Sequence, residues 1–422
     1  MSDTINLKDA EVIRRLAAET AEIAALPVHK MTAERWRALN DLRPVKPMVW
    51  MDEVPWNEMD VERELTLRCE DPFARNIELS LRRTIYSWRH MPGDMAVDPV
   101  YYAPPAVSDS GFGIEEKVRI VKTDPENTVV SRAFTSQFRN EADIAKIMTP
   151  KIEYDAARSE ADLAKTRQLL GGCLPAEMRG IVHAWTAPWD ILVTWWGVEP
   201  VLTDLVLRPE LVHAAVSRLV DAYLSRLDQW ENLNLLAWSE GNHRVGSGGL
   251  GYASDLPAPG FDARRVRPID QWGCAAAQIF SDVSPAMHEE FALRYERRWL
   301  ERFGLNYYGC CDALHNKIDI LKSIPRLRKI SMSPWADIDK GAAAIGTDFV
   351  FSWKPNPAIL AEERWDPERA RAEIRDALQR TRGLAVEIIM KDISTVHHEP
   401  RRLWEWARIA VEEAESFAES DG

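Results

Sequence analysis

The stretch RKISMSPWADIDKGAAAIGTDFVFSWK, residues 328–354, places a helical segment between two short runs of strand-forming residues. The runs 328–335 and 347–354 alternate apolar with polar residues, which is typical of β-strands. The segment 337–346 between them is rich in small helix-forming residues. Strands separated by helices in this rhythm require parallel pairing through right-handed crossovers. This unit is the repeat from which the fold is predicted.

The same rhythm extends in both directions along the 422 residues. From residue 178 onward, strand-like runs alternate with amphipathic helices, two of which are expected to begin at Pro209 and Pro285. Two earlier strand candidates, PMVWMDEVPW and DPVYYAPP, bring the number of units to eight. Eight units favour an α/β fold of the closed (β/α)8 TIM-barrel type, and an open doubly wound sheet is the alternative.

The remaining segments are expected to be additions to this barrel. Residues 1–45 carry apolar positions at helical spacing and are predicted to form an N-terminal helical cap. The barrel then covers 46–422, with insertions near 104–177 and 238–270. Within the first insertion, two alternating runs around Asp124-Pro125 predict a β-hairpin.

Composition and charge exclude several classes of protein. An apolar content of 46% allows a large buried core, and a net charge of -13 argues against a nucleic-acid partner. No run of about 18 apolar residues predicts a membrane span, and the N-terminus lacks a signal-peptide pattern. Five widely spread cysteines fit a reducing compartment, so we expect a cytoplasmic protein with free thiols.

The predicted strands carry polar residues on one face. Side chains alternate along a strand, and the apolar face is expected to meet the helix layer. The polar face is then expected to line an interior that ordinary barrels fill with Val, Ile and Leu. Unpaired burial costs about 1–3 kcal/mol per group, so these residues are expected to form a site. The alternative is an internal network in which Glu387 pairs with Lys391 or Lys354. The residues placed inside are Gln278, Asp282, Asn306, Tyr308, Cys310, Ser331, Ser333, Ser352, Lys354, Glu387 and Lys391.

The run YYGCCDALH, residues 307–315, brings two cysteines to the end of a predicted strand. Active sites of barrel enzymes lie at this end, and a Cys310 thiolate there could bind Zn²⁺ with a second ligand. Cys311 would point the other way in an ideal strand, unless Gly309 turns it inward. Adjacent cysteines are a weaker metal signature than a CxxC pair, so buried and inert thiols are the alternative.

A literal GxGxxG pattern occupies residues 246–251. A dinucleotide site needs a helix directly after such a pattern, and the segment 254–260 contains two prolines and a glycine instead. Nucleotide binding is therefore discounted. We expect a glycine-rich loop over the barrel mouth, with Glu240 and His243 at its entrance as substrate contacts.

Aromatic residues supply the remaining candidates for substrate binding. Most of the 17 tryptophans are expected to pack in the core or to lie scattered on the surface. Trp335 and Trp353, on neighbouring predicted strands, are expected to wall a pocket for an apolar or aromatic ligand. His183 in the strand-like run RGIVHAW is also assigned to substrate binding, whereas His397 and His398 are expected to be a solvated helix cap.

Five segments together resemble the uroporphyrinogen decarboxylase-like superfamily: SDVSPAMHEEF, YYGCCDALH, ISMSPWADIDKGAAAIG, FSWKPNP and VEIIMKDIST. The resemblance covers about residues 140–415 and implies a (β/α)8 barrel with its site at the strand C-termini. The decarboxylases carry an arginine-rich segment after the first strand, but this chain has the acidic MVWMDEVPWNE there. The cobalamin-dependent methyltransferases bind zinc through a His-x-Cys, which here reads Tyr308-Gly309-Cys310.

The resemblance implies a methyltransferase of a corrinoid-dependent demethylation system. It would move a methyl group between a small methylated donor, such as a methyl ether, methylamine or betaine, and a cobalamin on a separate carrier protein. Zinc would be bound by Cys310 with Cys311 or Glu387, and a homodimer stays open. The residues assigned to catalysis are Asp282, Tyr308, Lys354, Glu387 and Lys391. The alternatives are a decarboxylase of a small carboxylic acid and a barrel that binds a corrinoid or small ligand without turnover.

Overall fold

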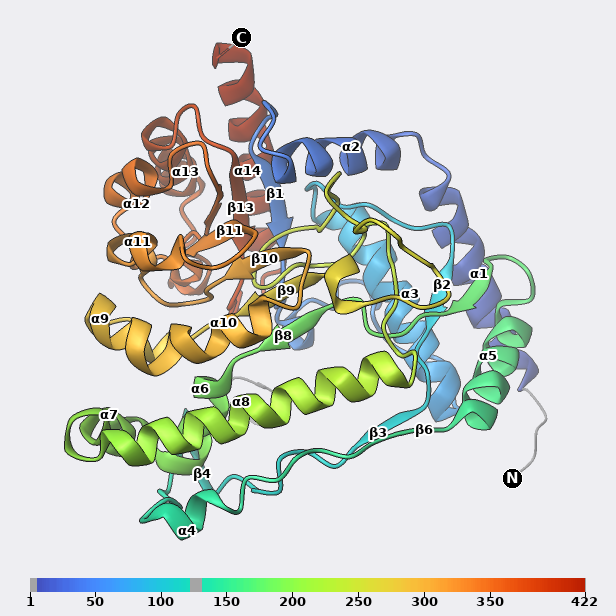
Figure 1. The fold of residues 1–422 in the computed structure, drawn as a ribbon. Coiled ribbons are helices and arrows are strands. Elements are labelled where there is room, and N and C mark those ends of the chain that lie inside the picture. The colour runs from blue at the N-terminus through green and yellow to red at the C-terminus, as the bar shows by residue number, and fades with distance from the viewer. Residues whose placement is uncertain (1–5, 122–130, 422) are drawn as a thin grey trace.

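The computed structural model describes residues 6–121 and 131–421, and its centre is a curved sheet of seven parallel strands (Figure 1). The strand order is β1-β13-β12-β11-β10-β9-β8, and every neighbouring pair is parallel. The strands are β1 Met48–Met51, β8 Ala184–Thr186, β9 Trp272–Ala275, β10 Leu305–Tyr308, β11 Leu327–Met332, β12 Val350–Trp353 and β13 Val386–Met390. The predicted parallel α/β architecture of barrel type is confirmed.

The sheet does not close into the predicted barrel, because β1 and β8 are its two edges in the described part of the chain. Irregular segments fill the seam between these edges. The Asp94 amide donates to the Val49 carbonyl at 2.8 Å beside β1, and Ile181 forms an isolated bridge with Leu236 near β8. The candidate DPVYYAPP forms only β2 Tyr101–Ala103, which pairs with β7 Ala176–Met178 instead of joining the main sheet. Its prediction as a barrel strand is wrong.

Helices cover the outer face of the sheet (Figure 1). Helix α3 Pro72–His90 begins after Asp71, whose carboxylate accepts a hydrogen bond from the Ala74 amide at 3.0 Å. The helix expected from Pro285 is present but contains a π-helical turn, η4 Glu289–Leu293. The others on this layer are α8 Pro209–Asn232, α9 Pro285–His288, α10 Arg294–Leu300, α11 Ile318–Leu321, α12 Ile338–Ile345, α13 Pro367–Arg380 and α14 Arg401–Asp421.

The two predicted N-terminal helices are α1 Leu7–Ala24 and α2 Val28–Asn40. Helix α1 packs on α3 and on α5 Ala156–Leu170, and these helices share a second apolar cluster. Helix α2 lies at the amino end of the sheet, where the fully buried Trp36 donates from its indole nitrogen to the Asp94 carbonyl at 2.7 Å. The N-terminal helices are therefore packed directly against the sheet domain.

The first insertion forms the predicted hairpin, in which β4 Val118–Val121 pairs antiparallel with β5 Ser131–Phe134. The turn expected at Asp124-Pro125 lies outside the described residues. The first insertion also contains β3 Val107–Asp109, β6 Ile152–Tyr154 and α4 Glu141–Ile144. Two helices, α6 Pro188–Trp196 and α7 Val198–Leu207, follow β8. In residues 6–121 and 131–421, no helix combines the length and apolarity needed to cross a membrane.

The glycine-rich loop lies in the space that the curved sheet encloses, so the prediction that it covers the barrel mouth is wrong. Leu250 and Tyr252 accept hydrogen bonds through their carbonyls from the Asn40 side chain, at 2.9 and 2.6 Å. An added Cβ at Gly249 would stand 2.1 Å from the Trp36 ring. Residues 245–252, hereafter the glycine plug, thus fill the amino end of the barrel. Glycine is needed there because the backbone passes directly against a buried indole.

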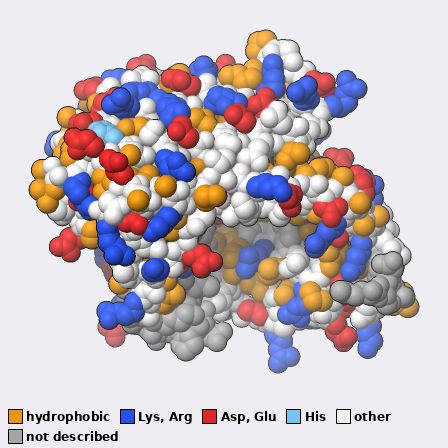
Figure 2. Space-filling model, turned by 60° about the horizontal axis from the view of Figure 1, so that its bottom comes forward, with side chains coloured by type: hydrophobic (Ala, Val, Ile, Leu, Met, Phe, Trp, Pro, Cys, Tyr) orange, Lys and Arg blue, Asp and Glu red, His pale blue; other side chains and the backbone are white. Residues whose placement is uncertain are grey.

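The surface carries mixed charge. On the face shown in Figure 2, Lys and Arg side chains lie among Asp and Glu side chains. Ion pairs such as Arg298–Asp221 at 2.6 Å join neighbouring helices at the surface. Side chains of both signs are therefore interspersed on this face, and the absence of a nucleic-acid partner stays a prediction from the net charge of -13.

Candidate active site at the carboxyl end of the sheet

A buried cluster of two thiols and an ammonium group lies where β10 and β13 end. Cys310 follows β10 by two residues, and Lys391 comes directly after β13. The Lys391 Nζ lies 3.4 Å from the Cys310 Sγ and 3.6 Å from the Cys311 Sγ. Gly309 has a φ of +99°, and this turn brings both thiols to the same side. The structure places Cys310 and Lys391 together at this edge of the sheet, and the catalytic and metal-binding roles assigned to them stay predictions.

The charges of this cluster depend on one another. The hydrogen bond with Cys311 and the charge of the Lys391 ammonium together lower the pKa of Cys310 to about 7, in spite of burial. The pKa of Cys311 is raised, because the neighbouring Cys310 thiolate and burial both disfavour a second negative charge. Burial opposes the charge on Lys391, but the two thiols raise its pKa. The cluster therefore favours one thiolate, on Cys310, beside the Lys391 ammonium at neutral pH.

Two carboxylates complete the outer side of the cluster. Asp392 accepts from the Lys391 ammonium at 2.6 Å and from the Cys311 thiol at 3.1 Å. Glu53, two residues after β1, lies 3.5 Å from the same ammonium and 3.3 Å from Arg244. Burial and the nearby Asp392 raise the pKa of Glu53. The contacts of Asp392 with Glu53, Lys391 and Cys311 lower the pKa of Asp392 to about 2, against the effect of burial.

A second lysine lies deeper, between the thiols and the glycine plug. The Lys354 ammonium donates to the Tyr307 hydroxyl at 2.6 Å and to the Ser352 hydroxyl at 2.8 Å. The Tyr307 hydroxyl also lies 2.9 Å from the Ser247 hydroxyl of the plug. Burial lowers the pKa of Lys354 to about 7, so this group exchanges a proton near neutral pH. Such a group can act as a general acid.

Glu387 is paired at the other end of the barrel interior. Its carboxylate accepts from the Lys329 ammonium at 2.8 Å and from the Gly249 amide at 3.3 Å, and both charged side chains are fully buried. The expected pairing of Glu387 with Lys391 or Lys354 is wrong. The sequence contained the signal, because Lys329 shares its strand face with Ser331.

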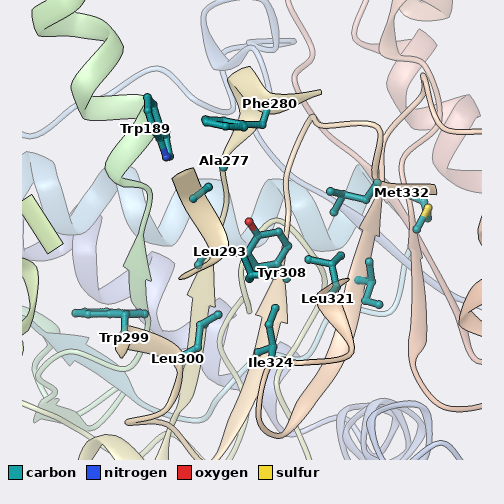
Figure 3. Close-up of a cluster of buried hydrophobic side chains, with 14 of the residues drawn as sticks. Trp189, Ala277, Phe280, Leu293, Trp299, Leu300, Tyr308, Leu321, Ile324 and Met332 are labelled. Carbon is teal, nitrogen blue, oxygen red and sulfur yellow. The ribbon is translucent and has the colours of Figure 1, made fainter. Parts of the chain in front are cut away.

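Strand β10 has the opposite face inward from the one predicted. Figure 3 shows the Tyr308 ring among hydrophobic side chains of the helix layer, including Leu293 and Leu321. The Tyr308 hydroxyl donates to Glu296 at 2.6 Å and lies 2.7 Å from the His288 Nε2. The helix layer thus supplies polar partners for Tyr308, although the prediction from strand faces expected only apolar contacts there. Tyr307, which the prediction placed outward, occupies the interior.

Asn306 and Gln278 also differ from the prediction. The Asn306 amide donates to the carbonyls of Leu300 and Pro325, away from the interior. Gln278 and Asp282 are predicted on one strand, but β9 ends at Ala275 and η3 Gln278–Phe280 follows it. Asp282 is consequently exposed on a loop beyond the strand, and the catalytic role predicted for it is not supported by its position.

The predicted substrate contacts do not form one pocket. The His183 Nε2 accepts from the Gly246 amide at 3.0 Å, and the His243 Nδ1 lies 2.5 Å from the Ser239 hydroxyl. Burial lowers the pKa of His183 to about 4 and that of His243 to about 3, so both rings are neutral. These two histidines hold the plug and its base in place.

The other three predicted contacts are scattered. Trp353 packs in the main core, and Trp335 is 70% exposed, so the two do not wall a shared pocket. Glu240 is exposed and lines a different pocket of about 460 Å³ on the side of the molecule, together with Trp238 and Tyr252. Neighbouring strands alone did not bring the two tryptophans together, because one lies on β12 and the other on the loop after β11.

The arrangement of the predicted zinc ligands does not fit a metal ion. The Lys391 ammonium lies against both sulfurs, and Glu387 is held by Lys329. Over residues 6–121 and 131–421, no group of three or more His, Cys, Asp or Glu side chains is placed to hold a metal. A tetrahedral site needs such a group. No chemical step is therefore assigned to zinc.

No protein-family model matches the chain, and no curated protein matches it significantly. Among solved structures, the fold is similar to that of a methyltransferase from Methanosarcina mazei at 12% sequence identity, with a TM-score of 0.48. The similarity covers 92% of this chain and 98% of that one. A likeness of this degree does not define an activity for this chain.

Proposed function

We propose that this chain is a methyltransferase that moves the methyl group of a small methylated donor to the cobalamin of a separate carrier protein. One observation carries the proposal: two groups whose pKa lies near 7, Cys310 and Lys354, are buried at the carboxyl end of a parallel α/β sheet. The sequence resemblance to cobalamin-dependent methyltransferases supports the same activity.

Removal of a methyl group from an ether oxygen or a neutral amine nitrogen requires a proton at the leaving atom, whereas the quaternary nitrogen of a betaine leaves as a neutral amine without one. The bond between the methyl carbon and this atom breaks, the methyl group passes to the acceptor, and the leaving atom keeps the electron pair. The cobalamin acceptor would supply the nucleophile. Lys354 supplies the proton through the Tyr307 hydroxyl, 2.6 Å away, since a buried amine with a pKa near 7 is an efficient acid at neutral pH.

The remaining residues orient these groups and exclude water. Lys391 fixes the charge of Cys310, and the resulting ion pair carries no net charge into the interior. The glycine plug closes the amino end of the barrel, and its Ser247 hydroxyl lies 2.9 Å from the Tyr307 hydroxyl. A site closed at one end strengthens each electrostatic contact within it, because water is excluded.

The proposal is tested with purified protein, reduced cobalamin and a panel of methyl ethers, methylamines and betaines. We expect the cobalt absorption spectrum to report methyl transfer from at least one donor. Lys354→Met should lower kcat about 100-fold or more, the usual contribution of a general acid. Cys173→Ser, an exposed cysteine outside the cluster, is the control and should leave the rate unchanged. Absence of transfer from every donor in the panel would overturn the proposal.

A decarboxylase is the second candidate, and the two buried lysines favour it. Lys354 and Lys391 both lie at the carboxyl end of the sheet, where they could bind a substrate carboxylate. The same protein samples, incubated with small carboxylic acids, report this activity through release of CO2. Release of CO2 without any methyl transfer would replace the first proposal by this one.

A further inference from the structure

A pocket of about 380 Å³ lies at the seam of the sheet, between the end of β1 and helix α3. We call it the seam pocket. Its wall is mainly apolar and includes Trp50, Trp56, Met51, Met91 and Met95. Flat indole rings and adaptable thioether side chains are the surfaces on which an aromatic ring packs well. The volume lies within the range of small-molecule sites.

One cation in this wall lacks a charged partner. The Arg83 guanidinium carbon lies 4.8 Å from the centre of the Trp56 ring. In the described part of the chain, the structure records neither an ion pair nor a side-chain hydrogen bond for Arg83. The Arg83 side chain is partly buried, and this burial lowers its pKa. A guanidinium in this position is available to an anionic ligand, to which it can donate two parallel hydrogen bonds.

The two acidic residues of the same wall both contact Arg244. Asp52 forms an ion pair with Arg244, and Glu53 lies 3.3 Å from Arg244 and 3.5 Å from Lys391. Arg83 is the cation of this wall for which, in the described part of the chain, no carboxylate partner is recorded. An anion bound at the Arg83 guanidinium would not have to displace a carboxylate of the protein.

The seam pocket is joined to the candidate active site through Glu53. Glu53 lines the pocket and lies 3.5 Å from the Lys391 ammonium, which is 3.4 Å from the Cys310 Sγ. A ligand in the pocket is thus separated from the thiol cluster by a single carboxylate layer. Thr84 and Ser87 on α3 add hydroxyl groups to the wall for polar substituents of the ligand.

We propose that the seam pocket binds a small aromatic carboxylate, with its carboxylate on Arg83 and its ring against the tryptophan and methionine side chains. A further step, which rests on the proposed function, is that the methyl donor is an aromatic methyl ether bearing a carboxylate. The binding site itself does not depend on methyl transfer.

The test is binding of benzoate and 3-methoxybenzoate, followed by calorimetry and by quenching of tryptophan fluorescence. Neutral methoxybenzene and the cation benzyltrimethylammonium are the comparison ligands. We expect the carboxylates to bind more tightly than both, and Arg83→Gln to weaken carboxylate binding about 10- to 100-fold. Arg83→Gln should leave the binding of methoxybenzene unchanged, and Arg83→Lys should restore part of the loss.

Arg89→Gln is the matched control, because Arg89 lies on the same helix but outside the seam pocket. The melting temperature of each variant reports whether it is folded. Carboxylate binding that survives Arg83→Gln, or equal binding of the cation, would overturn the inference. Carboxylate binding without methyl transfer from any donor would remove only the proposed function. Methyl transfer from donors without an aromatic ring, with no binding of benzoate, would remove only the inference.

Discussion

At the scale of single residues, burial decides which side chains of the site are charged, because a buried charge needs a partner of opposite sign. Cys310 and Cys311 are adjacent, and one of them holds the negative charge because the Lys391 ammonium can balance only one thiolate. The pKa of Lys354 stays near 7 because burial opposes its charge more strongly than the nearby Glu387 and Cys310 favour it. The pKa values thus follow from distances of a few ångströms.

The pKa of Cys310 gives the first prediction at this scale. Alkylation by iodoacetamide requires the thiolate, so the rate at Cys310 should rise with pH with a midpoint near 7. Lys391→Met removes the ammonium and should move this midpoint upward, toward the usual value for a cysteine of about 8.5. Mass spectrometry of the peptide 307–317 at a series of pH values measures the midpoint, with exposed Cys173 as a check on the reagent. An unchanged midpoint in Lys391→Met would contradict the assignment of this ion pair.

At the scale of elements, the glycine plug is the least expected feature. Its sequence pattern is that of a flexible loop, but Asn40, Glu387 and Trp36 hold it at the amino end of the barrel. The plug occupies space that Val, Ile and Leu fill in ordinary barrels. It also explains why Lys329 and Glu387 can be buried, since the backbone of the plug supplies part of their hydrogen bonds.

The second prediction concerns the space around the plug. Gly249→Ala would place a methyl group 2.1 Å from the Trp36 ring, so we expect a loss of unfolding free energy of about 3 kcal/mol. Gly172→Ala is the control, because Gly172 has open space around its Cβ position and carries only the cost of a φ of +80°, about 1 kcal/mol. Urea denaturation measures both. Equal losses in the two variants would show that the plug is not packed against Trp36.

At the scale of the whole molecule, the N-terminal helices and the sheet are joined by shared packing. Trp36 of α2 contacts the plug, donates to the Asp94 carbonyl and lies 5.5 Å from the Lys329 ammonium, measured to the ring centre. The seam between β1 and β8 is filled by the same Asp94 region. The N-terminal helices and the sheet should consequently unfold together.

The third prediction tests this joint packing. Trp36→Ala removes a fully buried indole and should lower the unfolding free energy by about 3–5 kcal/mol within a single cooperative transition. Trp335→Ala is the matched control, because Trp335 is 70% exposed and its removal should change stability by less than about 0.5 kcal/mol. Two separate transitions in calorimetry of the unmutated protein would contradict joint unfolding.

The amino-acid sequence by itself determined the order and direction of the main elements. Strand and helix periods are local properties, and parallel strands bring their carboxyl ends to one edge. For that reason the sequence alone predicts that Cys310, Lys354 and Lys391 lie near one another.

Only the tertiary structure decided which face of β10 turns inward, where the glycine plug lies and whether the sheet closes. Each of these depends on packing between segments far apart in the chain. Tyr308 faces the helices because Glu296 accepts a hydrogen bond from its hydroxyl and the His288 Nε2 lies 2.7 Å from the same oxygen. Tyr307 turns inward, where its hydroxyl accepts a hydrogen bond from Lys354. Polar partners supplied by distant elements have no signature in the local pattern of a strand.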